Sequence, residues 1–182
     1  MKFEYETDRL VLKILSTDWT ENILDFIYRN RMVFDPYEPT KPSGFYTYEY
    51  QFELIKNDYL SSLAHKSTRF YVFENENPDT IIGTVSLGHV TNFPYCSCIL
   101  GYKFDPNFQK KGYALEALQI AIEYAFKGLK LHKIKAYILE DNLPSINLVK
   151  KLGFNYEGKA IQSISVNGHW ADHLRYTLVN YK

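Results

Sequence analysis

The sequence predicts an α+β fold built on one mixed β-sheet, and three observations support this prediction. A strand, a long helix and a second strand follow one another between residues 95 and 139, an order typical of a crossover between parallel strands. Two apolar segments within residues 69–90 are separated by a short polar stretch, which indicates an antiparallel hairpin. The dipeptide Asn167-Gly168 is the strongest short hairpin signal and predicts a second antiparallel pair near the C-terminus.

Length and composition indicate a single domain over residues 1–182 with enough apolar surface for a core of its own. Lysine plus arginine and aspartate plus glutamate both number 21, and this neutral balance argues against a non-specific nucleic-acid binder. No segment approaches the roughly 18 continuous apolar residues of a membrane span. The first ten residues are too acidic and polar for a signal peptide, so we expect a cytoplasmic protein.

The N-terminal half contains one predicted strand and two predicted helices around a proline-rich segment. Residues 9–15 alternate apolar and polar side chains, as a strand does, and residues 16–19 offer caps for a helix that follows. Residues 32–50 hold three prolines and a glycine and are predicted to form a loop. This loop is either a connection pinned to the core by its aromatic residues or a wall or lid of a substrate cleft. Residues 52–63 show the pattern of the second helix.

The C-terminal half contains the clearest helix, which begins near Gly112. An apolar stripe is predicted on this helix, made of Leu115, Leu118, Ile122 and Phe126. An adjoining face of small residues comprises Ala114, Ala117 and Ala121. Residues 95–105 are predicted to be a fully buried strand, and residues 132–139 another. Asn142 can cap a short final helix, Pro144 suits its first turn and Gly153 its end.

The two cysteines, Cys96 and Cys98, stand two residues apart. Side chains at this spacing in a strand point to the same face and cannot readily form a disulfide bond. Without a second pair they cannot form a four-cysteine zinc site. We expect two reduced core residues and no metal, with a redox or metal-binding role as the alternative.

The loop before the long helix concentrates positive charge beside a flexible backbone. Lys110 and Lys111 precede Gly112, at which a helix N-terminus is expected to present free N–H groups. Such an end favours an anion, and a glycine lets a phosphate approach the backbone closely. An ordinary solvated turn is the alternative. The phosphate-loop pattern of nucleoside triphosphatases and the glycine pattern of dinucleotide folds are both absent from the sequence.

Two motifs resemble those of the GNAT N-acetyltransferases. Residues 109–114 read Q-K-K-G-Y-A, which is similar to the family's phosphate loop, Q/R-x-x-G-x-G/A. Downstream, Asn142 and Ser145 match an N-x-x-S motif whose helix ends in K-x-G-F at residues 151–154. Residues 98–118, 132–154 and 167–173 resemble the RimJ/RimL branch, which acetylates protein N-termini, including the alanine of ribosomal proteins. The resemblance covers nearly the whole chain and implies the GNAT fold, in which two parallel strands splay apart between flanking helices.

The resemblance also implies acetyl-CoA as cosubstrate, direct attack of the amine on the thioester, and a set of binding residues. The strand before the loop is implied to contact the pantetheine arm and the oxyanion through its backbone, at Leu100, Gly101, Tyr102, Lys103 and Phe104. The pyrophosphate is implied to lie on Gln109, Lys110, Lys111, Gly112, Tyr113 and Ala114. Asn142 and Asn147 are implied to bind the pantetheine side. Ser145 is either the residue near the leaving sulfur or a first-turn helix residue with no chemical role.

The general base is not assigned. RimL-like members carry a glutamate after the E-G pair that follows K-x-G-F, and Ile164 stands at the matching position here. Glu116 suits a dipole partner or structural contact in the first turn of the long helix. His89, Asp172 and His173 are further candidates, each also explained as a surface or structural residue. Phe34, Tyr37 and Glu38 lie in a segment that resembles the substrate-side loop of this branch.

Three functions follow from these observations. The leading hypothesis is acetylation of a protein N-terminal amine, with a ribosomal protein as the acceptor that the resemblance implies. The second is acetylation of a small amine, such as a polyamine, an amino acid or an aminoglycoside. The third is a non-catalytic module that binds coenzyme A, which the missing glutamate motivates. The sequence is compatible with a monomer or a homodimer.

Overall fold

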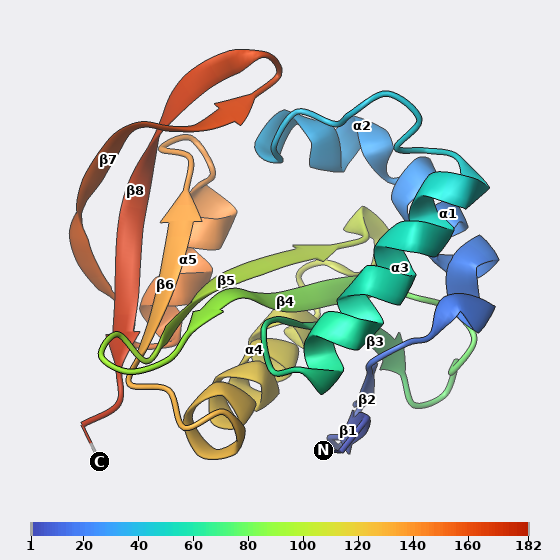
Figure 1. The fold of residues 1–182 in the computed structure, drawn as a ribbon, viewed down its shortest axis with the longest axis horizontal. Coiled ribbons are helices and arrows are strands. Elements are labelled where there is room, and N and C mark those ends of the chain that lie inside the picture. Colours follow the sequence, from blue (N-terminus) through green and yellow to red (C-terminus); the bar gives the residue numbers. More distant parts are fainter. Residues whose placement is uncertain (1, 182) are drawn as a thin grey trace.

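A computed structural model describes residues 2–181 as one eight-stranded sheet with helices on both faces (Figure 1). The strands are β1 (Glu4–Glu6), β2 (Leu10–Lys13), β3 (Thr68–Glu74), β4 (Gly83–Thr91), β5 (Ser97–Phe104), β6 (Lys133–Ile138), β7 (Asn155–Val166) and β8 (His169–Val179). Their spatial order is β1-β2-β3-β4-β5-β6-β8-β7. Within the described residues all neighbouring pairs are antiparallel except β5 and β6, so the predicted mixed sheet and its parallel crossover are confirmed.

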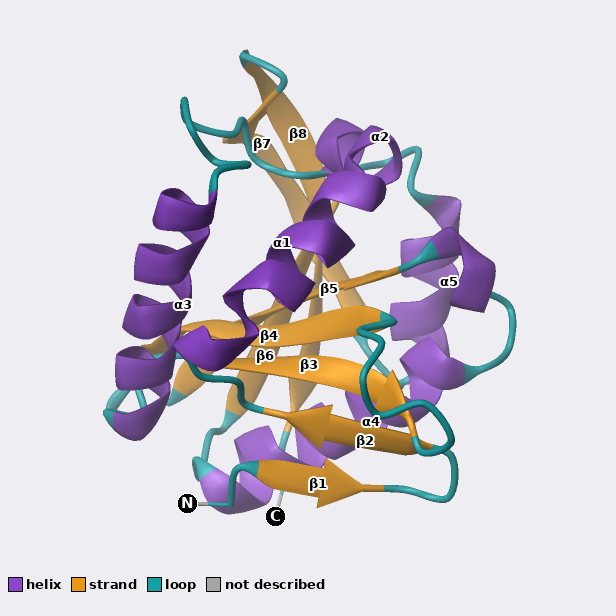
Figure 2. Cartoon of the chain, turned by 90° about the vertical axis from the view of Figure 1, so that its right-hand side faces the viewer, coloured by secondary structure: helices purple, strands orange, loops and turns teal. Residues whose placement is uncertain are grey.

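The five α-helices of residues 2–181 lie on the two faces of this sheet (Figure 2). They are α1 (Thr20–Arg29), α2 (Arg31–Phe34), α3 (Tyr48–Leu63), α4 (Tyr113–Glu123) and α5 (Leu143–Lys151). Strand β3 shows how one strand serves both faces, because Phe70 and Val72 pack in the cluster under α4 and α5, whereas Tyr71 and Phe73 pack in the cluster under α1 and α3. No helix in residues 2–181 has the length and apolar character needed to cross a membrane.

Helix α4 packs on the sheet mainly through its small residues. Ala117, Leu118 and Ala121 are fully buried, whereas Leu115, which the predicted apolar stripe included, is only half-buried. Small side chains allow the helix backbone to approach the sheet closely, and this places the helix start beside the ends of the strands. The helix continues into a wider turn at Tyr124–Gly128.

Three further elements differ from the sequence-based prediction. The short edge strand β1 was not predicted, because three residues are too few to show an alternating pattern. The predicted loop over residues 32–50 contains most of α2 and a 3-10 turn at Asp35–Tyr37, where Pro36 suits the first turn. Strand β7 begins at Asn155, so the closing hairpin reaches twelve residues upstream of the predicted turn at Asn167-Gly168.

The two cysteines occupy different environments. Cys98 lies in β5, and burial raises the pKa of its thiol to about 12. Cys96 lies before the strand, is half-buried and has a φ of 41°, so the prediction of two core residues is wrong for Cys96. Both are free thiols. Residues 2–181 contain no group of three or more histidine, cysteine, aspartate or glutamate side chains placed to hold a metal ion.

The parallel strands β5 and β6 pair only at their beginnings, through Ser97–Lys133, Cys98–Ile134 and Ile99–Lys135. From Leu100 onward β5 stays paired with β4, while β6 continues alongside β8. The two strands therefore diverge, as Figure 1 shows, and the outer edge of residues 100–104 lacks a neighbouring strand. The strand is also not fully buried, contrary to the prediction, because Ile99, Gly101, Tyr102 and Lys103 are only partly buried.

Candidate functional site

The loop from β5 to α4 is held in shape by its own polar side chains. Asp105 accepts a hydrogen bond from the backbone N of Asn107 at 2.9 Å and so caps the short turn Pro106–Phe108. The side chain of Gln109 turns back and donates from Nε2 to the carbonyl oxygen of Phe104 at 3.0 Å. Gln109 therefore closes the loop, while the side chains of Lys110 and Lys111 are exposed to solvent.

Gly112 occupies the N-cap position of α4 with a φ of 84°, a left-handed conformation that favours glycine. A Cβ at this position would lie 3.4 Å from Nη2 of Arg9. Among residues 2–181 there is no hydrogen-bond acceptor for the backbone N–H groups of residues 111–114. A helix start with several free N–H groups and two neighbouring lysines is a site at which an anion is stabilised.

Tyr102 and Ser145 connect the two sides of the splayed strands. The hydroxyl of Tyr102 on β5 donates to the carbonyl oxygen of Ser145 in the first turn of α5 at 3.1 Å. Burial raises the pKa of Tyr102 to about 12, so the hydroxyl stays protonated and remains a donor. Asn142 caps α5 as expected, because its Oδ1 accepts from the backbone N of Ser145 at 3.2 Å. Ser145 is half-buried and Asn147 is exposed.

The proline-rich loop is attached to the tip of the β7–β8 hairpin. The N–H of Thr40 donates to the carbonyl of Ser165 at 3.1 Å, and the N–H of Gly168 donates to Oγ1 of Thr40 at 2.8 Å. Pro39 and Val166 form an isolated β-bridge between the same two segments. The loop and the hairpin thus meet above the splayed strands, where Figure 1 shows them facing one another. Phe45 and Tyr46 also pack against the core. The loop is therefore attached to the core by its aromatic residues, which is the first of the two interpretations given for it.

Glu38 on this loop lies between two lysines. Its Oε1 is 2.7 Å from Nζ of Lys103 on β5, and its Oε2 contacts Nζ of Lys41. Burial lowers the pKa of Lys103 to about 8, although the ion pair with Glu38 acts in the opposite direction. Burial alone would raise the pKa of Glu38, but Lys103 and Lys41 hold it below its usual value. The cluster therefore carries more positive than negative charge.

The three predicted substrate-side residues differ in accessibility. Phe34 is buried, with its ring centroid 5.5 Å from that of Phe26 and 5.1 Å from Nζ of Lys103. Glu38 is half-buried in the lysine cluster, and Tyr37 is exposed. Of these side chains, Phe34 is the one that the structure places in the core.

The candidate bases are held in contacts of their own. Glu116 accepts hydrogen bonds from Nε of Arg9 at 2.8 Å and from the hydroxyl of Thr7, which is the structural contact that we considered for it. His173 is buried, with Nδ1 3.2 Å from Oγ of Ser163. Asp172 accepts from the backbone N of Gln162 at 2.8 Å. His89 is exposed at a bulge in β4, and Ile164 pairs with Ala171 in the hairpin. Within residues 2–181 none of these groups hydrogen-bonds to Tyr102 or Ser145.

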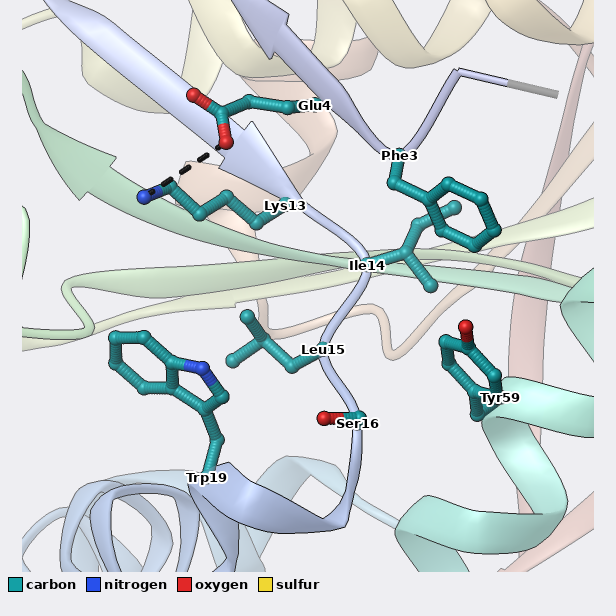
Figure 3. Close-up of a pocket in the computed structure, with 8 residues that line it drawn as sticks. All are labelled: Phe3, Glu4, Lys13, Ile14, Leu15, Ser16, Trp19 and Tyr59. Carbon is teal, nitrogen blue, oxygen red and sulfur yellow. Dashed lines mark ion pairs between the residues drawn. The ribbon is translucent and has the colours of Figure 1, made fainter.

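A separate open depression of about 320 Å³ lies at the other end of the sheet, where β1 and β2 meet α1 and α3 (Figure 3). Its lining residues are Phe3, Glu4, Lys13, Ile14, Leu15, Ser16, Trp19 and Tyr59. The charged pair within it, Lys13 and Glu4, is 3.8 Å apart. Strands β3 and β4 separate this end of the sheet from β5, so the depression is not part of the splayed site.

Comparison with known proteins places the chain among acetyltransferases. A model of the acetyltransferase (GNAT) domain matches residues 9–155. A probable N-acetyltransferase of Bacillus subtilis, YjcK, is 32% identical over 164 residues, which cover 90% of each chain. The [ribosomal protein uS5]-alanine N-acetyltransferase of Escherichia coli is 31% identical over 177 residues, covering 95% of this chain and 89% of that protein.

A solved structure shows the same fold over the whole chain. The ribosomal-protein-S5-alanine acetyltransferase from Vibrio fischeri superposes with a TM-score of 0.93 at 28% identity. The superposition covers 100% of this chain and 98% of that one.

Proposed function

The chain belongs to the acetyltransferase (GNAT) family, and from this membership we propose that it acetylates the N-terminal amine of a protein. It is an N-acetyltransferase that uses acetyl-CoA as the acetyl donor. The proposed acceptor is a ribosomal-protein N-terminus that begins with alanine, the acceptor named for the E. coli relative. Residues 1–182 act as one catalytic domain in this proposal.

The splayed strands and the α4 start are the proposed binding surface for coenzyme A. The unpaired edge of β5 offers the backbone groups of Leu100, Gly101, Tyr102, Lys103 and Phe104 to the pantetheine arm. Residues 109–114 offer free N–H groups and two lysines to the pyrophosphate. Asn142 and Asn147, at the start of α5, contact the pantetheine side. The closure of the loop by Gln109 supports this arrangement, because it ties the loop back to the end of β5.

The proposed chemistry is a direct transfer. Acetyl-CoA supplies an activated thioester carbonyl, the acceptor nitrogen forms a bond to its carbon, and the carbon–sulfur bond breaks. A backbone N–H within residues 100–102 stabilises the oxyanion that develops on the carbonyl oxygen. The hydroxyl of Ser145 donates its proton to the leaving thiolate and regains one from water, and Tyr102 fixes the first turn of α5 through the Ser145 carbonyl. The proton of the amine leaves to water, with no side chain assigned as base.

The observation that carries the acceptor proposal is the charge of the Glu38 cluster. Its only carboxylate is already paired with Lys103 and Lys41. A polyamine bears several positive charges and would be recognised by free carboxylates, which this cluster does not supply. A peptide N-terminus bears one positive charge and loses it before attack, so it is a better match to this cluster.

A thiol-release assay with acetyl-CoA tests the proposed function. We expect turnover with a peptide that begins with alanine and none with the same peptide carrying a blocked N-terminus. Spermidine and an aminoglycoside serve as small-amine acceptors and are expected to react poorly. Turnover on the small amines alone would show that the acceptor is a small amine and not a protein N-terminus. Binding of coenzyme A without turnover on any amine would favour a non-catalytic module.

Replacement of Ser145 with alanine distinguishes a role at the leaving sulfur from a purely structural role in the first turn of α5. If the hydroxyl assists the leaving thiolate, kcat is expected to fall about 100-fold, as loss of a positioned proton donor does, while KM for acetyl-CoA stays constant. If Ser145 is only a first-turn residue, kcat should stay within about twofold of the unmodified enzyme. The backbone contacts with Asn142 and Tyr102 are retained in the variant, and thermal unfolding checks that α5 is intact.

A further inference from the structure

The turn between β1 and β2 is bound to the candidate phosphate loop through Arg9. Its Nη1 donates to the carbonyl oxygen of Lys111 at 3.0 Å, and its Nε donates to Oε2 of Glu116 at 2.8 Å. Its guanidinium lies 4.9 Å from the ring centroid of Tyr113 and 3.4 Å from the position that a Cβ of Gly112 would take. One side chain from the edge of the sheet thus contacts both ends of the loop-to-helix junction.

Other contacts hold both Arg9 and its partner in place. The carbonyl oxygens of Thr7 and Asp8 accept hydrogen bonds from Nδ2 of Asn75 at 3.1 and 3.2 Å, which orders the turn that carries Arg9. The hydroxyl of Thr7 donates to Oε1 of Glu116. Burial alone would raise the pKa of Glu116, but the hydrogen bonds from Thr7 and Arg9 hold it below its usual value. Glu116 is therefore a charged and immobilised anchor.

These contacts affect the N–H groups that face an anion. The carbonyl of Lys111 is the peptide oxygen immediately before the N–H of Gly112, so fixing this carbonyl fixes the direction of that N–H. The anchor at Glu116 fixes the first turn of α4, which carries the N–H groups of Tyr113 and Ala114. A preformed set of donors binds an anion without the cost of ordering a flexible loop.

We propose that Arg9 is a positioning residue for the pyrophosphate of coenzyme A, acting through the Lys111 carbonyl and the Glu116 carboxylate. The inference rests on the proposed function, because it takes the loop as the pyrophosphate site. It adds a residue far away in the sequence that does not belong to the loop motif.

The test compares a ligand that contains the pyrophosphate with one that lacks it. Calorimetry measures the affinity for coenzyme A, and KM is measured for acetyl-CoA and for S-acetyl-pantetheine. Arg9→Met is expected to weaken coenzyme A binding about tenfold and to leave KM for S-acetyl-pantetheine unchanged. Arg31→Met is the matched control, because Arg31 also donates to a backbone carbonyl and lies over a tyrosine ring, yet it does so at α2. The proposal would be contradicted if Arg9→Met raised KM equally for acetyl-CoA and S-acetyl-pantetheine, or raised neither KM.

Glu116→Gln distinguishes positioning from simple charge. Removing a negative charge near the pyrophosphate would tighten coenzyme A binding if only the net charge mattered. Positioning predicts weaker binding, because the amide holds Arg9 less firmly than the carboxylate does. Tighter binding by Glu116→Gln would overturn the role of Arg9 and leave the loop assignment intact. If the unmodified protein bound coenzyme A no better than pantetheine, the loop assignment would fall, and the Arg9 proposal with it.

Discussion

Replacement of Gly112 with aspartate is expected to reduce the affinity for coenzyme A by at least about 100-fold, which corresponds to about 2.7 kcal/mol. The new carboxylate would lie at the start of α4, where the free N–H groups of residues 111–114 and the helix dipole attract an anion. It would occupy this position itself and repel a pyrophosphate. The added Cβ would also stand 3.4 Å from Nη2 of Arg9 and press against that side chain. Calorimetric titration with coenzyme A measures the effect.

The matched control is Gly168→Asp. Gly168 has a φ of 78°, close to the 84° of Gly112, so both substitutions place an aspartate in a left-handed backbone conformation. A Cβ at Gly168 has no neighbour within 4 Å, and the residue lies in the β7–β8 turn. The control should lose some stability and keep its affinity for coenzyme A. Equal affinities in Gly112→Asp and the unmodified protein would refute the assignment of the loop.

Features that depend on neighbouring residues were predictable from the sequence. Asn142 caps α5, and Gly153 follows that helix with a φ of 84°. Asn167 and Gly168 both have positive φ in the predicted hairpin turn, and Gly112 is the N-cap of α4, where the charge pattern indicated a helix start. In each case the residue type carries its own conformational preference, so the sequence predicts the local structure without knowledge of the partner segments.

Features that depend on distant residues were not predictable in the same way. Arg9 and Glu116 are 107 positions apart, and Lys103 and Glu38 are 65 apart, so no spacing rule connects either pair. Lys103 sits in a strand that reads as a continuous apolar segment, and its largely buried side chain pairs with Glu38, a contact that no local pattern predicts. Cys96 was expected in that strand as well, but it directly follows the turn at residues 93–95, and β5 begins only at Ser97.

Replacement of Lys103 with methionine is expected to raise KM for a peptide acceptor about tenfold while KM for acetyl-CoA stays within about twofold. Glu38 would keep Lys41 but lose its link to β5, so the loop that carries Glu38 would be less firmly held. The backbone of residue 103, which we propose to contact pantetheine, is unaffected by this change. Steady-state kinetics with each substrate varied in turn separate the two effects.

The same variant should alter the pH dependence of stability. Burial lowers the pKa of Lys103 from its ordinary 10.5 to about 8, so the unfolded chain binds more protons than the folded chain between these values. Stability therefore rises with pH in this interval, by at most about 1.4 kcal/mol per pH unit from this group. Above pH about 10 the buried tyrosines act in the opposite direction, because their raised pKa values favour unfolding as they ionise. Denaturant unfolding at pH 8, 9 and 10 should show this rise in the unmodified protein and lose it in Lys103→Met.

Lys13→Met is the control that separates this effect from the general loss of a strand lysine. Lys13 lies on β2, pairs with Glu4 at 3.8 Å and has its Nζ 5.4 Å from the ring centroid of Phe73, so its contacts resemble those of Lys103. It stands on the strand next to the far edge of the sheet, away from the splayed strands. The control should therefore keep the KM for the peptide and the rise of stability between pH 8 and 10. If Lys13→Met and Lys103→Met gave the same pH profile and the same KM, the Glu38 cluster would have no particular part in holding the acceptor side of the enzyme.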